Sequence, residues 1–398
     1  MQALRNLLVI EAIRVVFVLL SPILLFTART GRGRCIGIMT VSIVMALTWI
    51  SSAYITMELL PLAPMGKVFP PESIKATLFL IEMIGFWFSV LVAIVTFLTL
   101  LIRRPLYYSD AVSCWTSHFL GPVWLLRVQH VWFPEADWVW LGVQLITRLD
   151  PWMSRDQARL MRDVVRETLD EVAETHGYSQ LPPAFPLLFW GSFRRPDHGH
   201  FYSFMPSHEP GETLGLFVVL HGHGGNFFLW PHSWKEFADE QRCIIVSPSF
   251  GYGNWEHPHG VNAVERCLNY AETHFPIDPT RIYLAGISQG GCGVARSGAA
   301  LGNRLAGLVF LSPTMEPAVL NSPEFIEGYT GRPILVVQGG RDHNVKPQSV
   351  DSAVAILKQN GADVTYHTDP NADHFLYFVK RDEIHTIIGD WMKLNITP

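Results

Sequence analysis

The sequence predicts an α/β fold in residues 181–398, preceded by an all-α membrane region in residues 1–104. Three observations carry this prediction. Short apolar runs alternate with helical stretches in the C-terminal half, which is typical of a mostly parallel sheet with helices on both faces. Long apolar runs with almost no charge fill the N-terminal region. Finally, Gly-Ile-Ser-Gln-Gly at residues 286–290 lies between a predicted strand and a predicted helix.

The composition agrees with a chain that lies partly in lipid. Of 398 residues, 49% are hydrophobic and 16% are charged, whereas about 25% of a typical soluble domain is charged. Residues 1–150 carry 11 Lys/Arg and 8 Asp/Glu, and the rest of the chain is acidic. This acidity argues against nucleic-acid binding. The five cysteines are scattered and form no Cys-x-x-Cys pair, so neither a zinc ribbon nor a disulfide framework is indicated.

Three transmembrane helices are predicted, at about residues 7–26, 35–59 and 78–102. Each contains a run of about 20 apolar residues, which matches the hydrocarbon core of a bilayer. The first span contains Glu11 and Arg14, which share one helical face and can pair there. The second span includes 23 residues without a formal charge before Glu58, and the third is closed by two arginines.

Basic residues set the predicted orientation of these spans. Arg29, Arg32 and Arg34 lie between the first two spans, and Arg103 and Arg104 follow the third. These five fall on one side of the membrane, against three basic residues on the other. We therefore expect a multi-pass integral membrane protein with an outside N-terminus and with everything after residue 104 in the cytoplasm.

Residues 105–180 are predicted to form a Trp-rich interfacial segment followed by an amphipathic helix. Five tryptophans lie between residues 111 and 150, and tryptophan is enriched at membrane–water boundaries. A fourth span in this stretch is the alternative, and it would move the C-terminal part to the other side. Ser154 and Gln157 form a capping-box pattern before a helix that ends near Gly177. That helix either links the two parts of the chain or packs on the globular part.

The globular part shows a regular alternation of elements. Helices are predicted at residues 261–274, 290–301, 350–359 and 382–394. Ligands bind at the carboxyl ends of the strands in such sheets, so candidate chemistry is sought just after each strand. The predicted strands are residues 200–205, 214–220, 243–246, 281–285, 307–311, 334–338 and 364–368.

Ser288 lies at the turn between a predicted strand and a predicted helix, where Gly-x-Ser-x-Gly is typical of a nucleophile elbow. Gly286 and Gly290 fit this interpretation, because side chains two residues from the serine would collide with neighbouring backbone. The sequence therefore predicts Ser288 as a nucleophile.

A glycine-rich loop, which includes Gly222 and Gly224, follows the strand at residues 214–220 and leaves backbone N–H groups exposed. We predict that the N–H groups of His223 and Gln289 form an oxyanion hole. We interpret His221 as a structural residue that holds the loop. A metal site formed by His221 and His223 is the alternative.

The acid and the base of a catalytic triad are sought in later loops. Asp342 lies four residues after a predicted strand, and it suits the acid that orients a histidine. His374 lies in the loop after the last predicted strand and is the predicted base. His367 falls inside that strand and His385 inside the terminal helix, so neither is favoured.

Four motifs in this order make residues 185–398 resemble the α/β-hydrolase superfamily: 220–225, 286–291, 340–345 and 373–375, with 277–283 leading into the elbow strand. Within the superfamily the chain is similar to the carboxylesterase/phospholipase group, which includes acyl-protein thioesterases, dienelactone hydrolases and polyhydroxybutyrate depolymerase-like esterases. The resemblance implies an eight-stranded sheet and a triad of Ser288, Asp342 and His374. Asp373 departs from the pattern, since relatives often have glycine there. The first 180 residues resemble no such family.

The expected function is a membrane-anchored serine hydrolase that cleaves carboxylic ester or thioester bonds through an acyl-enzyme, without a metal or organic cofactor. A substrate that is a lipid ester or another hydrophobic molecule is expected from the predicted bilayer location. A serine peptidase, an acyltransferase, or an inactive membrane interaction or sensor protein are the alternatives. Aromatic residues after strands are predicted either to line an acyl pocket or to pack in the core: Phe227, Phe228, Trp230, Phe250, Tyr252, Trp255 and Phe375.

Overall fold

The structure of the protein is a computed structural model. The structure describes residues 40–50, 83–94, 115–117, 135–151, 153–175 and 201–395. The chain divides into two compact units. One comprises Met1–Leu106 with Val131–Leu141, and the other comprises Tyr107–His130 with Gly142–Pro398.

The described part of the first unit contains helical residues 40–50 and 83–94. A Cβ on Gly85 would lie 2.5 Å from the indole of Trp49, so the two helices pack closely at this glycine. None of the described helices combines the length and apolarity needed to cross a bilayer. The predicted span at residues 7–26 lies outside the described residues, as do most of the spans at 35–59 and 78–102.

The second unit is built on one eight-stranded sheet with the order β1-β2-β4-β3-β5-β6-β7-β8. β1 pairs antiparallel with β2, and β2 pairs antiparallel with β4. All the other neighbours are parallel. The strands are β1 (Trp115–Ser117), β2 (Phe201–Phe204), β3 (Leu214–Leu220), β4 (Cys243–Pro248), β5 (Ile277–Ile287), β6 (Gly307–Leu311), β7 (Pro333–Gly339) and β8 (Asp363–Asp369).

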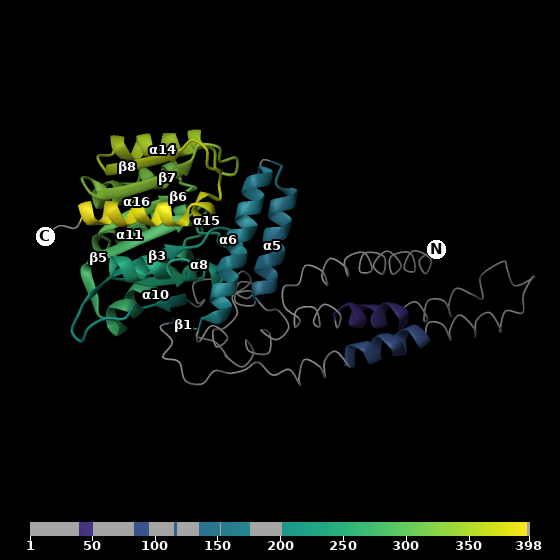
Figure 1. The fold of residues 1–398 in the computed structure, drawn as a ribbon. Helices are drawn as coiled ribbons and strands as arrows, with labels where there is room; N and C mark the ends of the chain where they lie inside the picture. The colour runs from purple at the N-terminus through teal and green to yellow at the C-terminus, as the bar shows by residue number, and fades with distance from the viewer. Residues whose placement is uncertain are drawn as a thin grey trace, which may run out of the picture. The chain divides into compact units, whose positions relative to one another are not determined.

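Helices cover both faces of this sheet (Figure 1). One face packs on α10 (His259–His274), α11 (Gly290–Leu301), α12 (Pro317–Leu320), α13 (Pro323–Tyr329) and α14 (Pro347–Gln359). The other face packs on α8 (Leu229–His232), α9 (Lys235–Gln241), α15 (Leu376–Val379) and α16 (Arg381–Leu394). The predicted α/β architecture is confirmed, with a short 3₁₀ helix, η5 (Gly302–Arg304), after α11.

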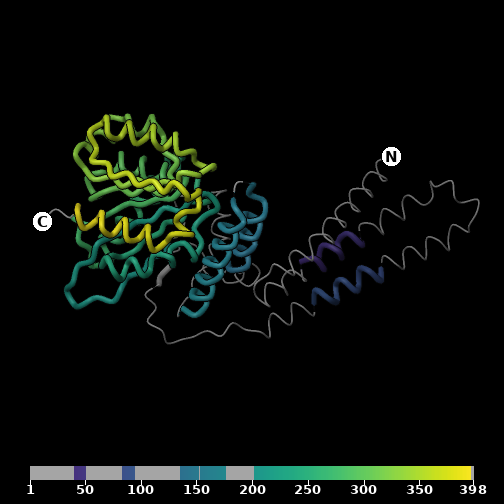
Figure 2. The backbone as a smooth tube through the Cα atoms, turned by 45° about the horizontal axis from the view of Figure 1, so that its top comes forward, coloured from purple at the N-terminus to yellow at the C-terminus, as the bar shows by residue number. Residues whose placement is uncertain are grey.

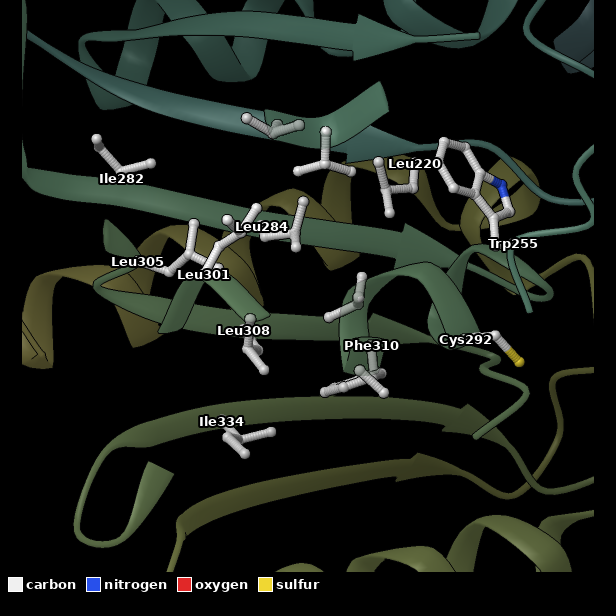
Figure 3. Packing of buried hydrophobic residues seen from close by; sticks show 14 of the residues in the cluster. Leu220, Trp255, Ile282, Leu284, Cys292, Leu301, Leu305, Leu308, Phe310 and Ile334 are labelled. Atoms are coloured by element: carbon white, nitrogen blue, oxygen red, sulfur yellow. The ribbon is translucent and has the colours of Figure 1, made fainter. Parts of the chain in front are cut away.

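The alternation of side chains in β3 explains why two cores form. Leu216, Val218 and Leu220 point to the face that α10 and α11 cover. Phe217 and Val219 point to the opposite face, as expected for the period of two in a strand. Every residue of β3 is buried, so the strand reads as a continuous apolar run at the centre of a parallel sheet. Figure 3 shows the first of these cores around Leu220, Leu284 and Trp255.

The amphipathic helix predicted after Ser154 is α6 (Arg155–Glu174), and its capping box is confirmed. Ser154 Oγ accepts from the Gln157 N–H at 3.2 Å, and the Gln157 side chain accepts from the Ser154 N–H at 3.0 Å. The helix does not stand apart as a linker, because its apolar face packs on α8 and α15. In the chain it follows α5 (Glu135–Leu149), and Figure 2 traces its backbone as one continuous helix.

Residues 115–117 correct one prediction. These three residues are predicted to belong to an interfacial helical segment, but they form an edge strand paired with β2. Aromatic and β-branched residues favour strands wherever a partner edge is available. The remaining residues of the predicted interfacial segment before α5 lie outside the described part of the chain.

Candidate active site

Ser288 lies in the turn between β5 and α11, where the elbow was predicted. Its backbone has a φ of 53°, in the left-handed region that non-glycine residues rarely adopt. The turn is fixed by main-chain bonds on both sides: the Ser288 N–H donates to Leu311 O at 2.9 Å, and Ser288 O accepts from the N–H groups of Gly291 and Thr314. The strained conformation is therefore held in place by three hydrogen bonds.

The two glycines that flank the elbow are required by close approaches. A Cβ on Gly286 would lie 2.6 Å from Gly290 O, and a Cβ on Gly290 would lie 2.6 Å from Leu220 O. Real Cβ atoms do not tolerate such distances to backbone, so a larger residue at Gly290 would push α11 away from β3. The structural role predicted for both glycines is present.

His374 connects the serine to a buried acid. Its Nε2 lies 3.0 Å from Ser288 Oγ, and its Nδ1 lies 2.8 Å from Asp342 Oδ2. The histidine follows β8 and the aspartate follows β7, so the parallel sheet brings both to the same edge. A chain from Ser288 Oγ through the imidazole to the carboxylate is the geometry in which a histidine removes a proton from a serine hydroxyl.

Backbone and side-chain donors surround the Asp342 carboxylate, which is 2% exposed. Its Oδ1 accepts from the N–H groups of Asn344 and Val345, both at 2.8 Å. Its Oδ2 accepts from the Gln338 amide at 3.2 Å as well as from His374. The carboxylate can therefore be charged although it is buried, because every donor it needs is supplied by the chain.

The glycine-rich loop after β3 lies against the elbow. A Cβ on Gly222 would lie 3.2 Å from the Ser288 Cβ, so the loop passes beside the serine. Gly224 has a φ of 102°, a conformation that glycine adopts without strain. Within the described part of the chain, no acceptor is bonded to the backbone N–H of His223 or of Gln289. Both amides therefore meet one requirement of the predicted oxyanion hole.

His221 is buried and holds the glycine-rich loop through both of its ring nitrogens. Its Nδ1 lies 2.7 Å from Gly222 O, and its Nε2 accepts from the Phe250 N–H at 3.1 Å. Since a backbone N–H donates to Nε2, the ring proton is on Nδ1 and donates to the carbonyl. Both ring nitrogens are used by the backbone, so His221 has none left to bind a metal.

A second loop, residues 249–256, covers the glycine-rich loop and was not predicted. The Trp255 indole N–H donates to His221 O at 2.8 Å, and Tyr252 O accepts from the Gly224 N–H at 3.0 Å. The Glu256 carboxylate accepts from the Gln289 side-chain amide. The sequence carries little signal for these contacts, because they join residues about 30 positions apart and two of the three involve main-chain atoms.

The aromatic residues predicted for a pocket divide into two groups. Phe228, Trp230 and Trp255 are buried at 3%, 5% and 0% exposure and belong to the two cores, so the packing alternative is correct for them. Phe250 is buried with Trp255. Of the others, Phe227 and Phe375 are partly buried and Tyr252 is 54% exposed. Tyr252 stacks on the His223 ring, and Phe375 meets the His374 ring edge-on.

Asp373, the residue that departs from the superfamily pattern, lies partly buried beside the base. Burial raises the pKa of the Asp373 carboxyl, and the like charges of Asp342 and Asp150 act in the same direction. Its Oδ1 accepts from the Phe375 N–H at 2.9 Å, which holds the loop after His374 in a tight turn.

Comparison with known proteins gives one family match. Residues 323–396, less than a fifth of the chain, match the prolyl oligopeptidase family. The matched residues include Asp342 and His374 but not Ser288. No curated protein sequence matches the chain.

Two solved structures illustrate the fold similarity. Est1E from Butyrivibrio proteoclasticus is 20% identical, with a TM-score of 0.40, over 50% of this chain and 94% of Est1E. The S-formylglutathione hydrolase of Staphylococcus aureus is 16% identical, with a TM-score of 0.42, over 50% of this chain and 92% of that enzyme. The fold assignment rests on the chain itself, because a mostly parallel sheet with a strand–serine–helix elbow is the arrangement of the α/β-hydrolase fold.

Three histidines are buried in the described part of the unit that contains the sheet, and their burial leads us to expect that the folded protein loses stability in acid. Burial lowers the pKa of His221 to about 4, of His232 to about 4 and of His385 to about 3. Each folded pKa is below the unfolded value of 6.5, so the unfolded chain binds more protons below pH 6.5. The free energy of unfolding should fall from pH 6.5 to pH 4, by up to about 1.4 kcal/mol per pH unit for each histidine.

Urea unfolding followed by tryptophan fluorescence at pH 6.5, 5.5 and 4.5 measures this loss. His232→Gln should make the stability less dependent on pH, whereas His274→Gln, at an exposed position, should leave the dependence as it is in the wild type. Equal pH slopes for the two variants would show that burial of His232 is not the cause.

Proposed function

We propose that the protein is a serine hydrolase that cleaves carboxylic ester or thioester bonds through an acyl-enzyme. The observation that carries the proposal is the continuous chain from Ser288 Oγ through His374 to the buried Asp342, with distances of 3.0 and 2.8 Å. A histidine held in this way by a carboxylate makes a serine hydroxyl nucleophilic.

In the proposed reaction, Ser288 Oγ attacks the substrate carbonyl while His374 Nε2 takes the hydroxyl proton. The oxyanion forms against the backbone N–H groups of His223 and Gln289. His374 then gives its proton to the leaving group, and the acyl group remains on the serine. Water repeats the cycle to release the acid. Asp342 keeps the imidazole oriented and stabilises its charged form throughout.

The substrate proposed is hydrophobic. The exposed Tyr252 ring stacks on His223, and the partly buried Phe375 ring lies against His374, so both offer aromatic surface next to residues of the proposed site. Phe227 is the third candidate, since Phe228, Trp230 and Trp255 are buried in the cores. A medium-chain p-nitrophenyl ester is therefore the first substrate to test.

Replacing the nucleophile tests the proposal directly. Ser288→Ala should abolish covalent labelling by a fluorophosphonate probe, and it should lower kcat for a p-nitrophenyl ester on the order of 10⁴-fold or more. Ser297→Ala, a buried serine in the following helix, should keep both labelling and turnover. Labelling of Ser288→Ala at the wild-type level would refute the assignment.

A serine peptidase is the second candidate, and the match of residues 323–396 to the prolyl oligopeptidase family favours it. The two candidates differ in the leaving group, which is an alcohol or thiol in one case and an amine in the other. We expect turnover of a p-nitrophenyl ester and none of peptide p-nitroanilides that carry proline, alanine or phenylalanine at the cleaved position. Comparable kcat/KM for an ester and a p-nitroanilide would favour the peptidase.

We also propose that the N-terminal region anchors the enzyme in a membrane through spans at about residues 7–26, 35–59 and 78–102. The described helical pieces support this, since they expose large apolar side chains to their surroundings. These side chains are Ile43, Leu47, Ile50, Ile84, Trp87, Phe88, Leu91 and Ile94.

Membrane fractionation measures the anchoring. The full chain should stay in the membrane pellet after an alkaline carbonate wash, and protease added to intact cells should leave the hydrolase part uncut if that part is cytoplasmic. Release of the chain by carbonate would contradict the anchor. Cleavage of the hydrolase part in intact cells would reverse only the proposed orientation.

A further inference from the structure

Gln338, at the end of β7, is a polar residue with no exposed surface. Its amide nitrogen lies 3.2 Å from Asp342 Oδ2, 3.0 Å from Val345 O and 3.3 Å from Gly339 O. One side chain therefore bonds to the acid itself and to the backbone on both sides of it. Its own Oε1 receives no hydrogen bond within the described residues. The orientation of the amide is therefore set by the hydrogen bonds that its nitrogen donates.

The oxygen that Gln338 contacts is the one that faces His374. Asp342 Oδ2 lies 2.8 Å from His374 Nδ1 and is bound from another side by the Gln338 amide. The other oxygen, Oδ1, is fixed by two backbone N–H groups. Without Gln338, rotation of the carboxyl about its Cβ–Cγ bond would be restrained only at Oδ1 and by the histidine that it has to orient.

The charge of the donor also matters. An arginine or lysine in this place would neutralise the carboxylate, whereas an amide restrains it and leaves its negative charge to stabilise a protonated His374. The other charged groups close by do not replace this contact. Asp373 is another acid and repels the carboxylate, and Arg341 on the same loop donates to Asn371 instead.

We propose that Gln338 is a positioning residue for the reaction, which fixes Asp342 Oδ2 so that the carboxylate holds the His374 ring in line with Ser288. The inference rests on the proposed serine hydrolase function. It assigns no contact with substrate to Gln338, so its removal should change the rate of chemistry and leave substrate binding as it is.

Gln338→Met keeps the length of the side chain and removes its donors. The rate of fluorophosphonate labelling at Ser288, and kcat for a p-nitrophenyl ester, should fall about ten- to a hundredfold, the usual effect of losing a hydrogen bond to a charged group, with KM unchanged. The matched control is Val336→Ala, because Val336 is buried on the same face of β7 two residues earlier. At a similar loss in Tm, the control should label at close to the wild-type rate.

Gln338→Glu gives an independent readout. When the introduced carboxyl is ionised, it places a second negative charge near His374, which stabilises the protonated imidazole and moves the acid limb of the pH profile of kcat/KM to higher pH. When it is protonated, its O–H replaces the amide as the donor to Asp342 Oδ2, and the labelling rate should stay close to that of the wild type. Methionine at this position adds no charge and should produce no such displacement.

Three results would overturn the proposal. Labelling of Gln338→Met at the wild-type rate would do so. An equal loss of rate in Gln338→Met and Val336→Ala would show that Gln338 only packs the strand. In Gln338→Glu, an unmoved acid limb together with a labelling rate as low as that of Gln338→Met would show that the side chain does not act on the His374–Asp342 pair. Failure of the wild type to label at Ser288 is a separate outcome, since it removes the proposed function as well.

Discussion

The contact between the start of α11 and the end of β3 is the constraint on which the candidate site depends. Only glycine at position 290 allows it, since a Cβ there would lie 2.6 Å from Leu220 O and 3.0 Å from His221 O. The helix can then begin directly beside the strand, and the turn before it carries Ser288 with a φ of 53°. The same approach sets Gly222 against the serine, so this one close helix–strand contact places the candidate nucleophile and the loop of the proposed oxyanion hole together.

Around this crossing, buried polar groups are paired with neutral partners. His221 is satisfied by two main-chain groups, and Asp342 by two main-chain N–H groups and an amide in addition to His374. Ion pairs in the described residues, such as Arg242 with Glu212, are partly exposed. Because neutral donors leave a charge uncompensated, the negative charge of Asp342 remains available to stabilise an imidazolium at His374, which suits the acid of the proposed triad.

The central sheet could be predicted because buried parallel strands are continuous apolar runs. The triad candidates could be predicted because each of them follows such a run and they occur in a fixed order along the chain. The four-residue helices α8 and α15 could not, since a single turn is stable only where tertiary packing holds it. The burial of Phe228, Trp230 and Trp255 could not be predicted from the sequence either, because an aromatic residue after a strand has the same sequence pattern whether it lines a pocket or packs in a core. The contact of Gln338 with the acid could not be predicted for a similar reason, because a polar residue at the end of an apolar strand usually marks the start of a turn.

α6 connects the two loops of the site. The glycine-rich loop continues into α8, and the loop of His374 continues into α15, so each of these two loops leads into a four-residue helix. Both short helices pack on α6, where His232 of α8 lies 3.6 Å from Glu171. Single-turn helices have little stability of their own, so α8 depends on its packing against α6, β2 and β4, and α15 depends on its packing against α6 and α16. Because α6 is common to both, it supports the segments that follow the two loops, although it precedes the strands of the parallel sheet.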